Sequence, residues 1–137
     1  MRGDAIIVEQ HHRRAGRGVT DHILPKLRKT STRYTLSVAG ESGSGKSETA
    51  QALAEELGKA GINCTILQQD DYFVYPPRSN DQTRRQDIGW VGPQEVHLDV
   101  LDANLQAFHN GATSLVKPLV LYGQDQITEE TLDVAGS

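Results

Sequence analysis

The sequence predicts an α/β fold built around a mainly parallel sheet. An apolar, β-branched segment at residues 34–39 is followed by a glycine-rich loop and by a helix rich in Ala, Glu and Leu at residues 46–60. A second apolar segment, residues 63–71, comes next and ends in two aspartates. Strand, helix and strand in this order form the unit that joins two parallel strands.

Length and composition restrict the class of protein. The chain has 137 residues, which is enough for one domain with a modest core, and its net charge is −4. An acidic balance does not favour a nucleic-acid partner or an anionic membrane surface. We find no signal peptide and no apolar run long enough for a membrane span, so we expect a cytoplasmic protein without membrane contact.

The remaining elements are predicted from periodicity and from turn residues. Residues 5–8 are compatible with a short strand, and residues 9–29 are loosely helical, although Pro25 interrupts the pattern. We therefore divide the chain into an N-terminal extension (1–32) and one domain (33–137). Within the domain we expect a long polar loop at 76–93, a helix at 94–110, and a strand at 114–123 that lies at a sheet edge because Pro118 has no N–H.

The loop at residues 40–47, GESGSGKS, fits the pattern G-x-x-x-x-G-K-[ST]. Glycines let backbone N–H groups approach phosphate oxygens, and the following helix adds the positive end of its dipole. The lysine carries charge to the β- and γ-phosphates, and the serine hydroxyl ligates Mg²⁺. A strand before the loop and an amphipathic helix after it separate this P-loop from a chance match. We expect ATP and Mg²⁺ to bind here, at Gly40, Glu41, Ser42, Gly43, Ser44, Gly45, Lys46, Ser47 and Glu48.

The aspartate pair is the candidate for the catalytic acid or base. Asp70 and Asp71 follow the strand after the P-loop helix, and the carboxyl ends of parallel strands line the ligand crevice of such folds. A carboxylate there accepts the proton of an attacking hydroxyl or holds Mg²⁺. We predict Asp70 and Lys46 as catalytic, and Ser47, Asp70 and Asp71 as metal ligands. The alternative is a solvated Asp pair that opens a loop.

These motifs together resemble a known family. VAGESGSGKS followed by LQQDDYF is similar to the uridine kinase, phosphoribulokinase and pantothenate kinase group of P-loop kinases, and the similarity runs from about residue 34 to 125. The resemblance implies a three-layer P-loop NTPase fold and transfer of the γ-phosphate of ATP to a hydroxyl of a small metabolite. It also implies that Asp70 orients or deprotonates the acceptor, and that Tyr72, Phe73 and Trp90 contact it. Arg85, in the polar loop, is a further candidate for an anionic substrate.

The same resemblance predicts an incomplete chain. Members of the group continue with a strand that ends in an acid and with an arginine-bearing lid helix, whereas this sequence ends at TEETLDVAGS. We therefore expect a form truncated at its C-terminus, and a homodimer is one way to complete its sheet. The alternative functions are a nucleotide-binding module without its own catalysis and an NTP hydrolase switch, the latter disfavoured because no N-K-x-D motif is visible.

Overall fold

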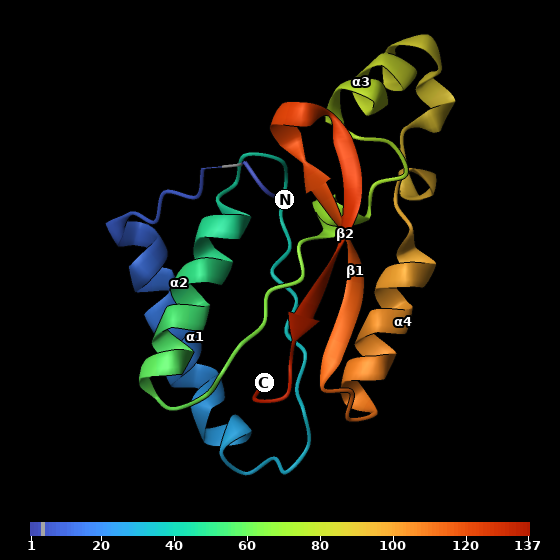
Figure 1. The fold of residues 1–137 in the computed structure, drawn as a ribbon. Coiled ribbons are helices and arrows are strands. Elements are labelled where there is room, and N and C mark those ends of the chain that lie inside the picture. The colour runs from blue at the N-terminus through green and yellow to red at the C-terminus, as the bar shows by residue number, and fades with distance from the viewer. Residues whose placement is uncertain (4) are drawn as a thin grey trace. The chain divides into compact units, whose positions relative to one another are not determined.

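A computed structural model describes residues 1–3 and 5–137 (Figure 1). The chain divides into two compact units. One contains Ala5–Ile66 and the last two residues, and it includes the P-loop. The other contains Leu67–Ala135 together with the first residues of the chain, and it includes the aspartate pair. The predicted domain boundary at residues 32 and 33 stays a prediction.

The P-loop unit is a pair of packed helices, α1 (Gln10–Leu27) and α2 (Lys46–Lys59). The apolar face of α2 is buried through Ala52, Leu53 and Leu57. Gly16 of α1 lies directly on the backbone of α2, since a Cβ on this glycine would come within 2.9 Å of the Ala52 carbonyl carbon. The pair therefore depends on a glycine at this crossing, and the helices predicted at 9–29 and 46–60 are confirmed.

The second unit is built on an antiparallel hairpin, β1 (Ser114–Leu121) and β2 (Gln126–Asp133). Helix α4 (Leu98–His109) packs against β1, and helix α3 (Pro77–Gln86) precedes it in the chain (Figure 1). Short 3-10 turns connect these elements, at Gln69–Tyr72, Ile88–Trp90, Pro93–Glu95 and Tyr122–Gln124. The core of the unit consists of Tyr72, Leu115, Leu119, Val120 and Val134.

The predicted parallel sheet is wrong for the described part of the chain. Residues 5–8, 33–40 and 62–68 have no regular secondary structure, and the sheet that forms is the two-stranded antiparallel hairpin. A strand needs a hydrogen-bonded neighbour, and no local pattern of apolar residues tells whether a neighbour is available. In the 34–39 segment Tyr34 and Leu36 are exposed. The α/β class itself is confirmed.

Two further elements differ from the prediction. The polar run at 76–93, expected to be a loop, forms α3 between residues 77 and 86. Pro77 occupies the first turn of this helix, where the backbone N–H would have no partner within the helix, so its absence costs nothing. Arg84 and Arg85 lie in the last turn, where the negative end of the helix dipole stabilises cations. The strand β2 was not predicted at all, because its sequence QITEETLD is mostly polar.

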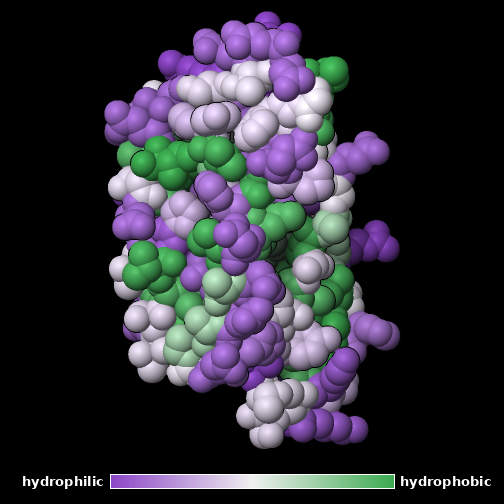
Figure 2. All heavy atoms as spheres, turned by 90° about the vertical axis from the view of Figure 1, so that its right-hand side faces the viewer, coloured by the Kyte–Doolittle hydropathy of each residue, from purple (hydrophilic) through white to green (hydrophobic). Residues whose placement is uncertain are grey.

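The helix predicted at 94–110 and the strand predicted at 114–123 are confirmed with shorter bounds, Leu98–His109 and Ser114–Leu121. In the part of the chain that the structure describes, no helix combines the length and the apolar character that a bilayer span requires. Figure 2 shows the side that carries α3 and α4, where hydrophobic groups form separate patches between hydrophilic ones.

Candidate functional site

The P-loop owes its path to its glycines. Gly43 and Gly45 have φ of 74° and 80°, a region that residues with a Cβ rarely adopt. At Gly40 a Cβ would come 2.7 Å from the Ser44 hydroxyl oxygen. The turn is closed by a hydrogen bond of 3.2 Å from the Ser44 N–H to the Glu41 carbonyl. Positions 43 and 45 therefore favour glycine through their backbone conformation, whereas at Gly40 the Ser44 hydroxyl is the end of a side chain and can rotate away.

The helix that follows places its first turn at the same point. Gly45 is the N-cap of α2, and Lys46, Ser47 and Glu48 form its first turn. First-turn N–H groups have no carbonyl partner within the helix, so they are available to an anion. Lys46 Nζ donates to the Glu41 carbonyl at 2.7 Å, which holds the ammonium group over the loop. The backbone and side chains present therefore fit a nucleoside triphosphate with its Mg²⁺.

The two aspartates lie in different surroundings. Asp70 is exposed in the 3-10 turn Gln69–Tyr72. Asp71 is buried, and it accepts hydrogen bonds from Lys117 Nζ at 2.6 Å and from the Val120 N–H at 3.0 Å. The Met1 amino group also lies 3.0 Å from its carboxylate. Both oxygens of Asp71 are thus used inside the unit, which disfavours the predicted role of Asp71 as a metal ligand.

Burial alone would raise the pKa of Asp71, because it penalises the charged form. The hydrogen bonds from Lys117, the Val120 N–H and the amino terminus outweigh burial, and the pKa of Asp71 lies below its ordinary value. The carboxylate is therefore ionised at neutral pH. It anchors the segment that carries Asp70 and Asp71, which we call the acidic segment, to the hairpin.

Sequence reasoning missed Lys117, the partner of Asp71. Its side chain is 2 % exposed, and Nζ lies 2.9 Å from Glu130 Oε1, the carboxylate directly opposite on β2. Alternation along β1 puts Lys117 on the same face as Leu115 and Leu119, both buried. That alternation was the available signal, because a lysine on the apolar face of a strand needs an anionic partner.

The predicted substrate residues do not share one environment. Tyr72 has 0 % exposure, and its hydroxyl accepts a hydrogen bond from Asn104 Nδ2 at 3.0 Å. It is therefore a core residue that cannot contact the substrate that accepts the phosphate. Phe73 is half-buried in a bridge to Val96. Arg85 is exposed and ion-paired with Asp81 at 2.9 Å.

Trp90 belongs to a polar cluster that the sequence did not predict. Its Nε1 donates to Asn80 Oδ1 at 2.8 Å, and Asn80 Nδ2 donates to the buried Glu95 at 2.8 Å. Glu95 also accepts from Arg84 Nε at 2.5 Å and from the Gly92 N–H at 2.9 Å. The hydrogen bond from Arg84 is the main reason that the pKa of Glu95 lies below its ordinary value. The cluster ties α3 to the segment before α4, and it gives Trp90 a packing role.

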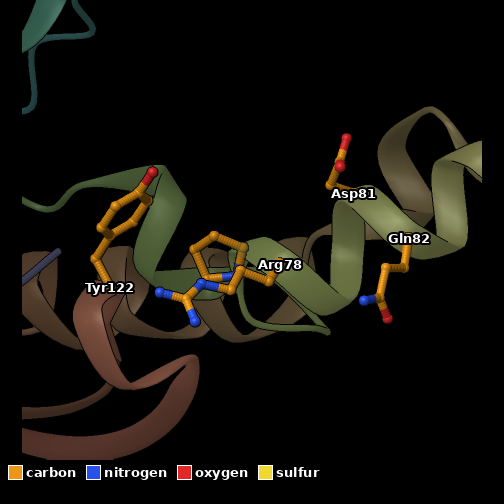
Figure 3. A pocket seen from close by; sticks show the side chains of 5 residues that line it. Arg78, Asp81, Gln82 and Tyr122 are labelled. Atoms are coloured by element: carbon orange, nitrogen blue, oxygen red, sulfur yellow. The ribbon is translucent and has the colours of Figure 1, made fainter.

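A shallow hollow of about 410 Å³ lies beside α3 in this unit. Figure 3 shows the Arg78 guanidinium reaching toward Tyr122, while Asp81 and Gln82 extend from α3 farther along. Pro77 completes its lining. Among the described residues no group of three or more His, Cys, Asp or Glu could hold a metal ion.

Comparison with known proteins identifies the family. A family profile described as Zeta toxin matches residues 20–98, a range that includes the P-loop and the acidic segment. The chain belongs to the Zeta toxin family. This Zeta toxin domain is P-loop kinase-like, so the kinase-like character predicted from the motifs is confirmed. The finer assignment to the uridine kinase group is not supported by any match.

One curated relative carries a kinase name. The Zeta toxin chain is 31% identical over 114 residues to the bifunctional alpha-galactosidase/sucrose kinase AgaSK of Mediterraneibacter gnavus. The alignment covers 76% of this chain and 12% of that relative, so the chain spans about an eighth of the relative's length. No solved structure matches the chain.

Proposed function

We propose that this protein is an ATP-dependent phosphotransferase that acts on a hydroxyl group of a small molecule. The observation that carries the proposal is the P-loop: Gly43 and Gly45 in the left-handed region, followed at once by a helix whose first turn holds Lys46 and Ser47. Membership in a P-loop kinase-like family supports the reaction class.

Each residue has a defined task in this proposal. The loop amides from Gly40 to Ser47 bind the phosphates, Lys46 neutralises charge on the β- and γ-phosphates, and Ser47 ligates Mg²⁺. Mg·ATP supplies the phosphoryl group. Asp70, an exposed carboxylate, accepts the proton of the acceptor hydroxyl. Asp71 holds this segment to the hairpin through Lys117.

The acceptor class is the least restricted part of the proposal. The relative's name includes sucrose kinase activity, which makes a sugar hydroxyl a natural first candidate beside a nucleoside-like metabolite. Arg78 and Tyr122, which line the hollow beside α3, are of the residue types that bind sugars and anions.

The test is ATP consumption by the purified 137-residue chain with Mg²⁺, against sucrose and other sugars, sugar phosphates, nucleosides and pantothenate. Lys46→Ala and Asp70→Asn are the informative variants. Turnover that requires one acceptor and is lost in both variants would establish the kinase and its substrate. ATP binding that is lost in Lys46→Ala, without turnover for any acceptor, would instead establish the alternative, a nucleotide-binding module.

A further inference from the structure

Helix α1 brings a histidine into contact with the P-loop. A Cβ built on Gly45 would lie 2.7 Å from Nε2 of His12 and 3.3 Å from its Cδ2. Gly45 is the N-cap of α2 and the residue before Lys46. The edge of the imidazole that carries Nε2 therefore lies against the end of the loop where phosphate oxygens bind in P-loops.

The position of His12 is fixed by the packing of α1 on α2. One turn farther along α1, Gly16 lies on the backbone of Ala52 and Leu53. Arg13 NH1 donates to Glu55 Oε2 at 2.7 Å. The helix cannot slide along α2 without losing both contacts, so the histidine stays at the N-terminus of α2.

The proton on the ring is placed by a hydrogen bond on the other nitrogen. His12 Nδ1 accepts the backbone N–H of Glu9 at 3.1 Å, as part of the cap of α1. A neutral imidazole with an accepting Nδ1 carries its proton on Nε2. The nitrogen that faces the P-loop is therefore a donor in the neutral ring as well as in the charged one.

We infer that His12 is a phosphate-binding residue, which donates from Nε2 to the nucleotide held by the P-loop. This inference rests on the proposed function. His12 is not part of the P-loop pattern, because it lies 28 positions before Gly40, where the pattern begins. The titratable groups beside the ring are His11, whose ring centroid lies 3.9 Å away, and Glu9, the N-cap of α1. Lys46 and Glu48 follow Gly45 in the first turn of α2.

Two substitutions distinguish the role of Nδ1 from the role of Nε2. His12→Asn keeps an acceptor near the position of Nδ1, and so the cap of α1, but removes the donor at Nε2. His12→Gln places an amide N–H near the position of Nε2. His11→Asn is the matched control, because the neighbouring side chain is exposed. We would measure dissociation constants for Mg·ATP and for inorganic tripolyphosphate by calorimetry, with thermal unfolding to verify that each variant is folded.

The inference expects His12→Asn to weaken binding of both ligands by about tenfold or more, as for other hydrogen bonds to charged groups. His12→Gln should retain most of the affinity, and His11→Asn all of it. Wild-type affinity in His12→Asn, or equal losses in His12→Asn and His12→Gln, would overturn the inference. If Lys46→Ala abolishes binding while His12→Asn does not, only the role of His12 fails. If the unaltered chain binds neither ligand, the proposed function fails and this inference with it.

Discussion

Lys117 and Asp71 form a buried ion pair across 46 positions of the chain, with Nζ of the lysine 2.6 Å from Oδ2 of the aspartate. The lysine also reaches Glu130 on the neighbouring strand at 2.9 Å. The acidic segment is thereby fastened to the inner face of the hairpin. Asp70, the next residue, remains exposed. One aspartate of the pair is thus used for structure, and its neighbour is accessible to solvent.

Lys117→Met should destabilise the protein strongly. The substitution leaves Asp71 and Glu130 without their shared cation, and breaking a buried pair from one side costs about 3–5 kcal/mol. The Met1 amino group, 3.0 Å from Asp71, favours the lower end of that range. The free energy of unfolding in urea measures the loss. Arg85→Ala, which breaks the exposed pair with Asp81, should change it by less than about 1 kcal/mol. Equal effects of the two substitutions would contradict the argument.

Stability should fall in acid through Asp71 and Glu95. The pKa of both carboxyl groups lies below its ordinary value in the folded protein. Their stabilisation is therefore complete above the unfolded-state pKa of about 4, and it disappears as the pH falls through the lower folded-state pKa. Unfolding free energies of Asp71→Asn and Glu95→Gln, measured from pH 7 downward, should depend less on pH than those of the unaltered protein. Glu129→Gln removes an exposed carboxylate and is the control. Parallel curves for all four proteins would refute the assignment.

Gly16→Ala should loosen the pair of helices that carries the P-loop. The new methyl group would lie 2.9 Å from backbone atoms of Ala52 and Leu53, and backbone cannot rotate away as a side chain can. Overpacking of this kind costs about 1–3 kcal/mol. In Gly18→Ala, two residues along α1, the methyl group meets nothing within 4 Å, so it should stabilise the helix by about 0.5–1 kcal/mol. Thermal unfolding of the two variants should therefore shift in opposite directions, and shifts of the same sign would count against the crossing.

Asp125→Ala should weaken helix α3. The Asp125 carboxylate accepts the Arg78 N–H at 2.7 Å and the Ser79 hydroxyl at 3.0 Å, so it caps the helix from 47 positions away. Loss of a cap costs about 0.5–2 kcal/mol. Asp125→Asn keeps an acceptor and tolerates the φ of 50° at this residue, so it should retain most of the stability. Hydrogen exchange of the α3 amides measures the effect locally. Unchanged protection in Asp125→Ala would show that the helix does not depend on this cap.

The elements held by local interactions could be predicted from the residues alone. The P-loop at residues 40–47 is specified by its glycines, and α2 and α4 by the spacing of their apolar residues, because helical hydrogen bonds join residues four apart. These local signals were enough to indicate a P-loop protein of kinase-like type.

Which segments pair and which charges are buried depends on contacts between distant parts of the chain, and no local pattern predicted them. The stretches at 34–39 and 63–71 have strand-like composition, but in the described chain they pair with no other strand. The mostly polar segment 126–133 pairs with β1 instead. Asp70 and Asp71 are adjacent residues of the same type, yet Asp70 is exposed and Asp71 is buried in an ion pair with Lys117. A strand, a remote helix cap and a buried ion pair each need a partner distant in the chain, and the partner is chosen only when the chain folds.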